Sequence, residues 1–253
     1  IYVASRSNSA MLYTVAGDAV VTSNGVITEV LDTAAETLYI PQGVTGVASG
    51  ALDGRSTNTV VLPRSGDALA LEDGWLGDSA VDTVLCYSEA QFDQTKESVG
   101  DGVKVLMLSR SLEGHTYYSL SRDDVEYSVL LTAASMTEFD GTVTAQDGSA
   151  VSITAIGSYA FEECDGLRCV SLPESVKQLD RAAFKGCTEL EYVLIGSTDS
   201  IYFGTGAFDN CPSLRFIASN AQTGLLEEGY SIKLTDGYAA DNTYLFAPTG
   251  CLG

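Results

Sequence analysis

The chain has 253 residues, enough for one or two globular domains or a single repeat array, and its hydrophobic content of 45% is enough to bury a core. Its 34 acidic and 13 basic residues give a formal net charge of −21, so its surface repels nucleic-acid phosphates and anionic lipid headgroups. We expect neither nucleic-acid binding nor membrane insertion, because no stretch approaches the roughly 20 apolar residues of a bilayer span. Since the chain begins at Ile1 and not at a methionine, we expect a segment of a longer product.

Residues 1–34 predict an N-terminal β cap. Apolar and polar residues alternate in Met11 to Val15 and again in Val20 to Thr22, on either side of a turn at Gly17 and Asp18. This pattern is typical of a hairpin. Placed before a larger core, such a hairpin covers the end that would otherwise be exposed.

Short apolar segments then recur at intervals of about 23 residues. Each is short enough to be a single strand. The spacing is broken between 109 and 150, where we expect an irregular or inserted segment. Within it, Thr142 to Ala145 lies before Asp147-Gly148 and predicts a hairpin arm, because Asp-Gly favours a tight primed turn. The predicted strands before 150 are 38–40, 60–62, 81–86, 103–108 and 127–131.

The repeat is clearest in Ala160–Cys164, Ala183–Cys187 and Ala207–Cys211, which share an Ala-Phe-x-x-Cys pattern. A leucine follows each cysteine by three residues, and two apolar positions spaced by two residues come next, as in a short strand. A single unit of this length exposes an apolar edge that only a stacked neighbour can bury. The pattern therefore predicts a β-rich solenoid over 35–253, with one parallel strand and a short helical turn per coil. A last strand is expected at 243–247.

The segment Ile156–Pro173 resembles the repeat unit of the BspA-type leucine-rich repeats of bacterial surface proteins, Ile-Gly-x-x-Ala-Phe-x-x-Cys-x-x-Leu-x-x-Val-x-Leu-Pro. The resemblance covers residues 150–219 and 35–63. Between these ranges only the period is retained, with Trp75, Leu76 and Ser79 near the Phe and Cys places. The resemblance implies a leucine-rich-repeat solenoid that is exported, located outside the cell or on its surface, and engaged in adhesion or protein binding. It implies no catalytic residues.

The chemistry-bearing side chains predict no catalytic, metal or cofactor site. Cys164, Cys187 and Cys211 recur at one repeat position, which indicates a column of buried free thiols. The only histidine, His115, is expected to be a solvated loop residue. Acidic loops such as Glu72–Gly74 and Asp140–Gly141 leave calcium binding as the less favoured alternative, since the alternating oxygen ligands of an EF-hand are absent.

Outward strand positions, the one between the two inward apolar residues and its neighbour two residues earlier, predict the functional surface. If the apolar residues spaced by two point inward, the residue between them points outward, and this outward row is unexpectedly apolar. A contiguous exposed apolar row marks an interface or is covered by another element, and both alternatives remain open. The candidate partner-binding face consists of Tyr39, Leu62, Leu85, Met107, Leu131, Tyr192, Leu194 and Phe216.

The sequence thus favours a non-catalytic extracellular interaction module that binds a protein or glycan, either host-derived or a second copy of the chain. Solenoids present long rigid surfaces suited to this role. The alternatives are a structural spacer and an accessory region of a larger secreted enzyme.

Overall fold

The computed structural model describes residues 3–4, 10–15, 18–31, 37–122, 124–197, 201–204 and 206–219. The chain divides into two compact units, Ile1–Leu108 and Ser109–Gly253. Among the described residues, no helix is both long enough and apolar enough to cross a membrane.

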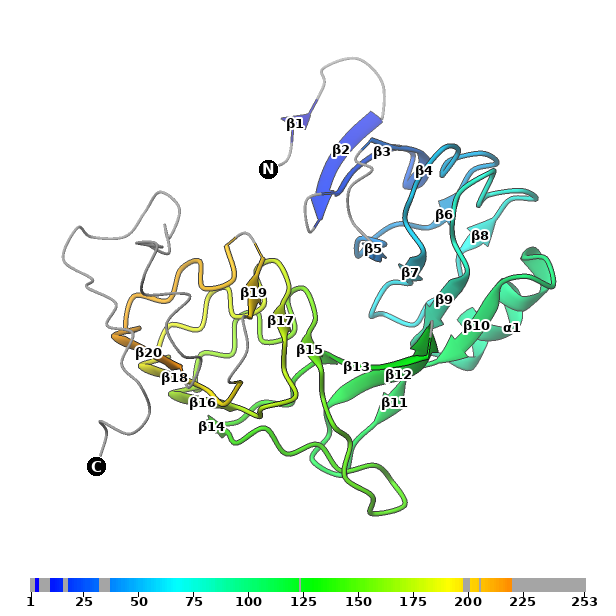
Figure 1. The fold of residues 1–253 in the computed structure, drawn as a ribbon. Helices are drawn as coiled ribbons and strands as arrows, with labels where there is room; N and C mark the ends of the chain where they lie inside the picture. The colour runs from blue at the N-terminus through cyan, green and yellow to red at the C-terminus, as the bar shows by residue number, and fades with distance from the viewer. Residues whose placement is uncertain are drawn as a thin grey trace. The chain divides into compact units, whose positions relative to one another are not determined.

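The first unit begins with an antiparallel meander that continues into the coils (Figure 1). β2 pairs with β3 from Val15↔Asp18 onward, which confirms the predicted hairpin cap. β4 then pairs in parallel with β6, the first short strand of the coils, through Val26↔Gly46. The strands of this sheet, in order, are β1 (Val3–Ala4), β2 (Ala10–Val15), β3 (Asp18–Ser23), β4 (Val26–Val30), β6 (Gly46–Val47) and β8 (Ala70–Leu71).

A second, wholly parallel sheet runs through the same coils. Its strands are β5 (Thr37–Tyr39), β7 (Thr59–Val61), β9 (Thr83–Cys86) and β10 (Lys104–Met107). Helix α1 (Glu89–Ser98) follows β9 and contacts β8, β9 and β10. Its first turn is capped by the Ser88 hydroxyl, which accepts a hydrogen bond from the Gln91 amide. The helix thus covers the last strands of the first unit.

The second unit opens with the antiparallel strands β11 (Ser109–Arg110), β12 (Thr116–Arg122) and β13 (Val125–Thr132). β13 then pairs in parallel with β15 (Ala155–Ile156), which is followed by β17 (Gln178–Leu179) and β19 (Tyr202–Phe203). A fourth sheet contains β14 (Glu138–Phe139), β16 (Cys169–Leu172), β18 (Tyr192–Ile195) and β20 (Phe216–Ser219), all parallel.

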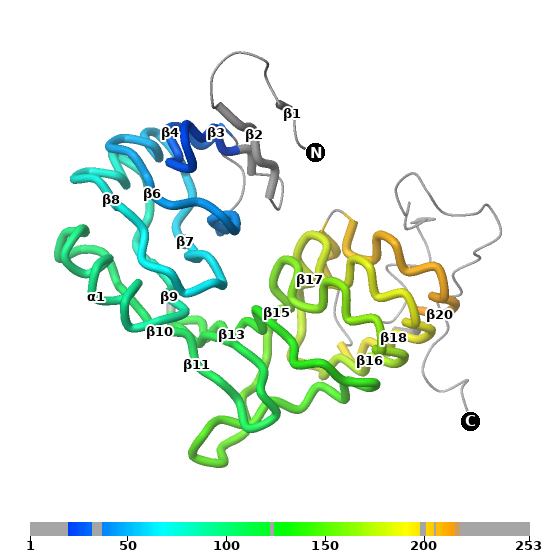
Figure 2. The backbone as a smooth tube through the Cα atoms, turned by 180° about the vertical axis from the view of Figure 1, so that it is seen from behind, coloured from blue at the N-terminus to red at the C-terminus, as the bar shows by residue number. Residues whose placement is uncertain are grey.

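The coils that begin with β5, β7, β16 and β18 each contribute a strand of three or four residues and a second strand of two residues, whereas α1 follows β9. Figure 2 shows the coils as stacked turns of the tube. The coils of about 23 residues and their parallel strands are confirmed, and the short second strand was not predicted. The strand predicted at 127–131 exists, but it pairs antiparallel with β12. The bridge between Thr144 and Ala150 confirms the hairpin at Asp147–Gly148. The strand predicted at 243–247 lies outside the described residues, and the domain boundaries at 34/35 and 109–150 stay predictions.

Repeated side chains fill the core of the second unit. Phe139, Phe161, Phe184 and Phe208 form what we call the phenylalanine column, with neighbouring ring centroids 5.1, 4.7 and 5.3 Å apart. The Cys187 and Cys211 thiols each donate a hydrogen bond, at 3.0 Å, to the carbonyl of Phe161 and Phe184 respectively. Both cysteines are buried thiols outside any disulfide, as predicted, whereas the Cys164 thiol, also outside any disulfide, is only half-buried.

Candidate interaction surface

Two residues of the predicted face, Tyr192 and Leu194, lie together in the structure. They are on the outward side of the β14–β16–β18–β20 sheet. Val170, Leu172, Val193 and Ile195 point inward and are buried. Because side chains alternate along a strand, the residues between them point away from the core. We call this outward side the outer strand face. Its described side chains, which are half-buried or exposed, are Glu138, Cys169, Ser171, Tyr192 and Leu194.

Tyr192 is the most prominent side chain of the outer strand face, with 39% of its surface exposed. The strand register places it between Cys169 and Phe216, and places Leu194 between Ser171 and Ala218. The predicted residue Phe216 therefore continues the tyrosine row by its backbone position, while its side chain lies outside the described part. Neighbouring parallel strands bring the described side chains Cys169, Ser171, Tyr192 and Leu194 close enough to form one contiguous patch.

Charged side chains lie at one margin of this patch. The Arg168 guanidinium lies 2.7 Å from a carboxylate oxygen of Glu191, the residue before Tyr192. Hydrogen bonding to Glu191 raises the pKa of Arg168 above its usual value. The Cys169 thiol has its pKa raised by burial and by the nearby Glu138, so it stays protonated and is a poor nucleophile. The described part of the outer strand face thus has Tyr192 and Leu194 as its apolar centre and charged side chains at its margins.

In the first unit the predicted exposure is wrong at Leu62 and Leu85. Leu62 is 2% exposed and belongs to the core, because Val60 faces inward beside Leu38 and the residue two positions later returns to the same side. Leu85 is fully buried although it alternates with the inward residues Val84 and Cys86. Tyr39 is half-buried.

Met107 is exposed, at 39%, as predicted. Its strand β10 is the last of its sheet, and the register pairs it with the buried Cys86 and not with Leu85. The expectation of exposure fails at Leu131. Leu131 is 1% exposed and lies on β13, whose neighbours are the hairpin strand β12 and a two-residue strand. Of the eight predicted residues, the structure brings Tyr192 and Leu194 together, with the backbone of Phe216 beside them.

The prediction of a solvated His115 is wrong, because this residue is 2% exposed. Its Nδ1 accepts a hydrogen bond from the Ala134 amide at 3.1 Å. The only sequence signal for burial was the apolar pair Tyr117-Tyr118 that follows it.

The acidic loops bind backbone amides. Glu72 accepts a hydrogen bond from the Ser49 amide at 3.0 Å, and Asp140 accepts one from Thr142 at 2.8 Å. Across the described ranges, no group of three or more His, Cys, Asp and Glu residues is arranged to hold a metal ion.

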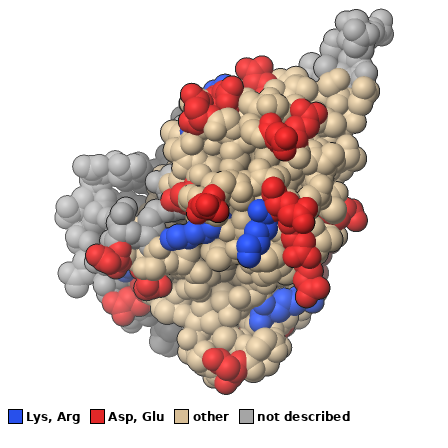
Figure 3. Space-filling view, turned by 90° about the vertical axis from the view of Figure 1, so that its right-hand side faces the viewer, with Lys and Arg blue, Asp and Glu red and all other residues tan. Residues whose placement is uncertain are grey.

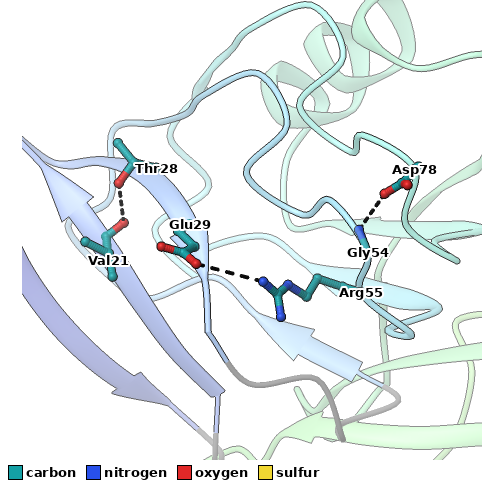
Figure 4. A network of polar contacts seen from close by, with 6 residues as sticks. All are labelled: Val21, Thr28, Glu29, Gly54, Arg55 and Asp78. Carbon is teal, nitrogen blue, oxygen red and sulfur yellow. Dashed lines mark hydrogen bonds and ion pairs between the residues drawn. The ribbon is translucent and has the colours of Figure 1, made fainter.

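Acidic side chains also link the cap to the coils in the first unit (Figure 4). Arg55, in the turn after β6, lies 4.0 Å from Glu29 of β4, and Asp78 accepts a hydrogen bond from the Gly54 amide of the neighbouring coil. On the face drawn in Figure 3 the basic side chains likewise lie beside acidic ones, with further acidic groups elsewhere. On this face the negative charge is therefore spread out and does not mark one site.

Comparison with known proteins agrees with the fold. A model of the "BspA type Leucine rich repeat region" matches residues 139–228 with six copies. A solved leucine-rich repeat protein from Bacteroides capillosus shares 29% identity, with 44% of this chain and 80% of that chain covered and a TM-score of 0.37. A leucine rich cell surface protein from Faecalibacterium prausnitzii shares 20% identity, with 72% and 53% covered and a TM-score of 0.30. No curated protein matches the chain. The protein is a β-solenoid whose residues 139–228 match the BspA-type leucine-rich repeat model.

Proposed function

We propose that this chain is a non-catalytic interaction module that binds a protein partner through the outer strand face of its second unit. The observation that carries the proposal is the exposed Tyr192, at the centre of an apolar patch on a regular sheet. Interface centres are enriched in tyrosine, and a charged rim such as Arg168 and Glu191 is typical of their edges.

The state of the described reactive groups supports a binding role. Cys169 keeps its proton, His115 is buried with its Nδ1 engaged by a backbone amide, and Glu72 and Asp140 hold turns. A catalytic centre needs such groups to converge on an accessible point. In this chain they serve separate structural purposes.

The outer strand face is the outward side of a sheet, which favours a protein over a small ligand because small molecules are held in concave sites. The family resemblance favours a location outside the cell or on its surface and an adhesive role, with a host protein or glycan as partner. A second copy of the chain is the alternative partner. A spacer or an accessory region of a secreted enzyme would need no such patch.

The test is binding of the purified chain to extracellular-matrix proteins and to a glycan array, with light scattering to measure self-association. We expect a saturable protein partner, and we expect Tyr192→Ser with Leu194→Ser to weaken its binding by about 30-fold or more, as loss of an interface centre does. The matched control is Tyr202→Ser on β19, which removes an exposed tyrosine from the other sheet of the same unit. Equal effects of the two variants, or binding unchanged in the double variant, would contradict the proposal.

A further inference from the structure

The turn between β11 and β12 holds the only histidine of the chain. Two backbone contacts fix the position of His115: its amide donates to the Ser111 hydroxyl at 3.1 Å, and its carbonyl accepts from the Ser111 amide at 2.9 Å. The side chain is thereby held in the interior of the second unit, where only 2% of the residue is exposed.

The imidazole joins this turn to two other segments. Its Nδ1 accepts the hydrogen bond from the Ala134 amide, just after β13. The edge of its ring meets Phe139 of β14, with the ring centroids 5.6 Å apart and the planes at 89°. A nitrogen that accepts a hydrogen bond carries no hydrogen, so the ring is neutral and its hydrogen is on Nε2. Phe139 begins the phenylalanine column, and His115 therefore lies at the end of that column.

We propose that His115 is an acid-sensitive latch, which in its neutral form fastens the Ser111–His115 turn to Ala134 and Phe139, and which opens when a proton from solvent binds Nδ1. The bound proton occupies the lone pair that Ala134 uses. The Ala134 N–H then faces the new N–H on Nδ1, so that two donors oppose each other, and a positive charge lies among buried groups. Both changes raise the free energy of the closed form. This end of the second unit is expected to loosen while the coils beyond it stay folded.

Two carboxylates act on the latch, one from each side. Glu113 lies in the turn itself, and Asp140 follows β14; both attract a cation at His115, but burial outweighs them and lowers its pKa below the ordinary value of 6.5. Burial of Glu113 raises its pKa, yet hydrogen bonds from Thr144 bring it down to about 2. The pKa of Asp140 is also lowered, chiefly by hydrogen bonds from Thr142. Both carboxylates thus stay ionised between pH 5 and 7.5, and His115 is the group of this cluster that titrates there.

The direction of the pH effect follows from linkage. The open form binds a proton near the ordinary pKa, whereas the closed form binds it only at lower pH, so acid favours opening. The closed form has its full stability above pH 6.5 and loses it as the pH falls toward the lowered pKa of His115. For each pKa unit between the two forms, the equilibrium constant for opening rises by about tenfold.

A single histidine makes the test direct. In the full chain, the His115 ring signals are followed by NMR from pH 7.5 to 4.5, and hydrogen exchange of the Ala134 amide is measured at pH 7.5 and 5.0, corrected for the intrinsic exchange rate. We expect a ring titration below pH 6.5, a neutral ring with its hydrogen on Nε2, and protection of Ala134 that falls by at least about threefold at pH 5.0.

The matched variant is His115→Asn, whose side-chain oxygen replaces Nδ1 as an acceptor but does not titrate in this range. We expect its Ala134 protection to be the same at both pH values. A wild-type ring that titrates at or above 6.5, or an equal loss of protection in wild type and variant, would overturn the proposal. If the variant does not fold, the ring titration of the wild type still decides. The latch is tested without any partner and is independent of the proposed binding function.

Discussion

The turns of the first and second units share one backbone pattern but differ in the side chains that fill it. The Cys187 amide donates to the Phe184 carbonyl, and in the same way Arg55 donates to Leu52 and Ser79 to Leu76. Leucine thus takes the phenylalanine place in the first unit, and arginine or serine takes the cysteine place. The coil backbone tolerates both fillings.

The two units differ in how the polar atoms at the cysteine position are hydrogen-bonded. In the second unit, the thiol at the cysteine place donates to the carbonyl of the coil before it, as Cys187 and Cys211 do. In the first unit, Arg55 Nε and Ser79 Oγ are buried and find no hydrogen-bond partner among the described residues. Compensation comes from individual contacts such as that of the Trp75 indole, which donates to Ser98 of α1 at 3.1 Å. A side chain that recurs makes the same contact in successive coils, whereas a position with varied side chains needs a different contact in each coil.

The largest expected effect comes from breaking the phenylalanine column. Phe184 is fully buried between Phe161 and Phe208. Phe184→Ala should lower the free energy of unfolding by about 3–5 kcal/mol, through lost apolar burial and the cavity left behind. Denaturant unfolding monitored by circular dichroism measures this loss. Tyr202→Ala, an exposed aromatic in the same unit, is the control and should stay within about 0.5 kcal/mol of wild type.

A smaller loss of unfolding free energy is expected at Gly77 of the first unit. This glycine occupies the repeat position that Lys185 has in the second unit. Its φ is +57°, and an added Cβ would meet the Asp53 carboxylate of the neighbouring coil. Gly77→Ala should therefore cost about 1–3 kcal/mol in unfolding free energy. Gly54→Ala is the matched control, since its φ is +68° but an added Cβ finds nothing within 4 Å. Equal costs in the two variants would show that backbone strain alone decides, without the contact to Asp53.

The smallest changes in unfolding free energy are expected at the repeat position of the cysteine, and they should have opposite signs in the two units. Cys187→Ala leaves the Phe161 carbonyl without the thiol and should cost about 1 kcal/mol. Ser79→Ala removes a buried hydroxyl that has no hydrogen-bond partner among the described residues, so it should be neutral or stabilising by up to about 1 kcal/mol. The shift of each variant's denaturation midpoint from that of wild type, compared at equal m-values, tests this difference in sign. Destabilisation of both variants by the same amount would remove the distinction between the units.

The sequence predicted the coils best where one side chain recurs. The Ala-Phe-x-x-Cys copies located the strands of the second unit. Two apolar residues that recur with a spacing of two allow only one assignment of the inward and outward positions. In the first unit every residue of Val60–Leu62 is apolar and buried, so alternation could not distinguish inward from outward, and Leu62 was placed on the wrong side. The two-residue strands were missed, since Gly46–Val47 and Gln178–Leu179 are too short to show a period. The burial of His115 depends on a contact with Ala134, 19 residues away, and no local pattern encodes such a contact.

The buried thiols of both units have a consequence for the conditions under which the protein keeps its structure. Burial raises the pKa of Cys86 to about 11, and the neighbouring Cys211, together with burial, raises that of Cys187. Thiol–disulfide exchange requires a thiolate, so these side chains react slowly with disulfides and with oxidants. Small exported domains commonly depend on an oxidising compartment for their cross-links. The described coils of this protein are held together by packing and backbone pairing, and their stability should be the same in reducing and in oxidising surroundings.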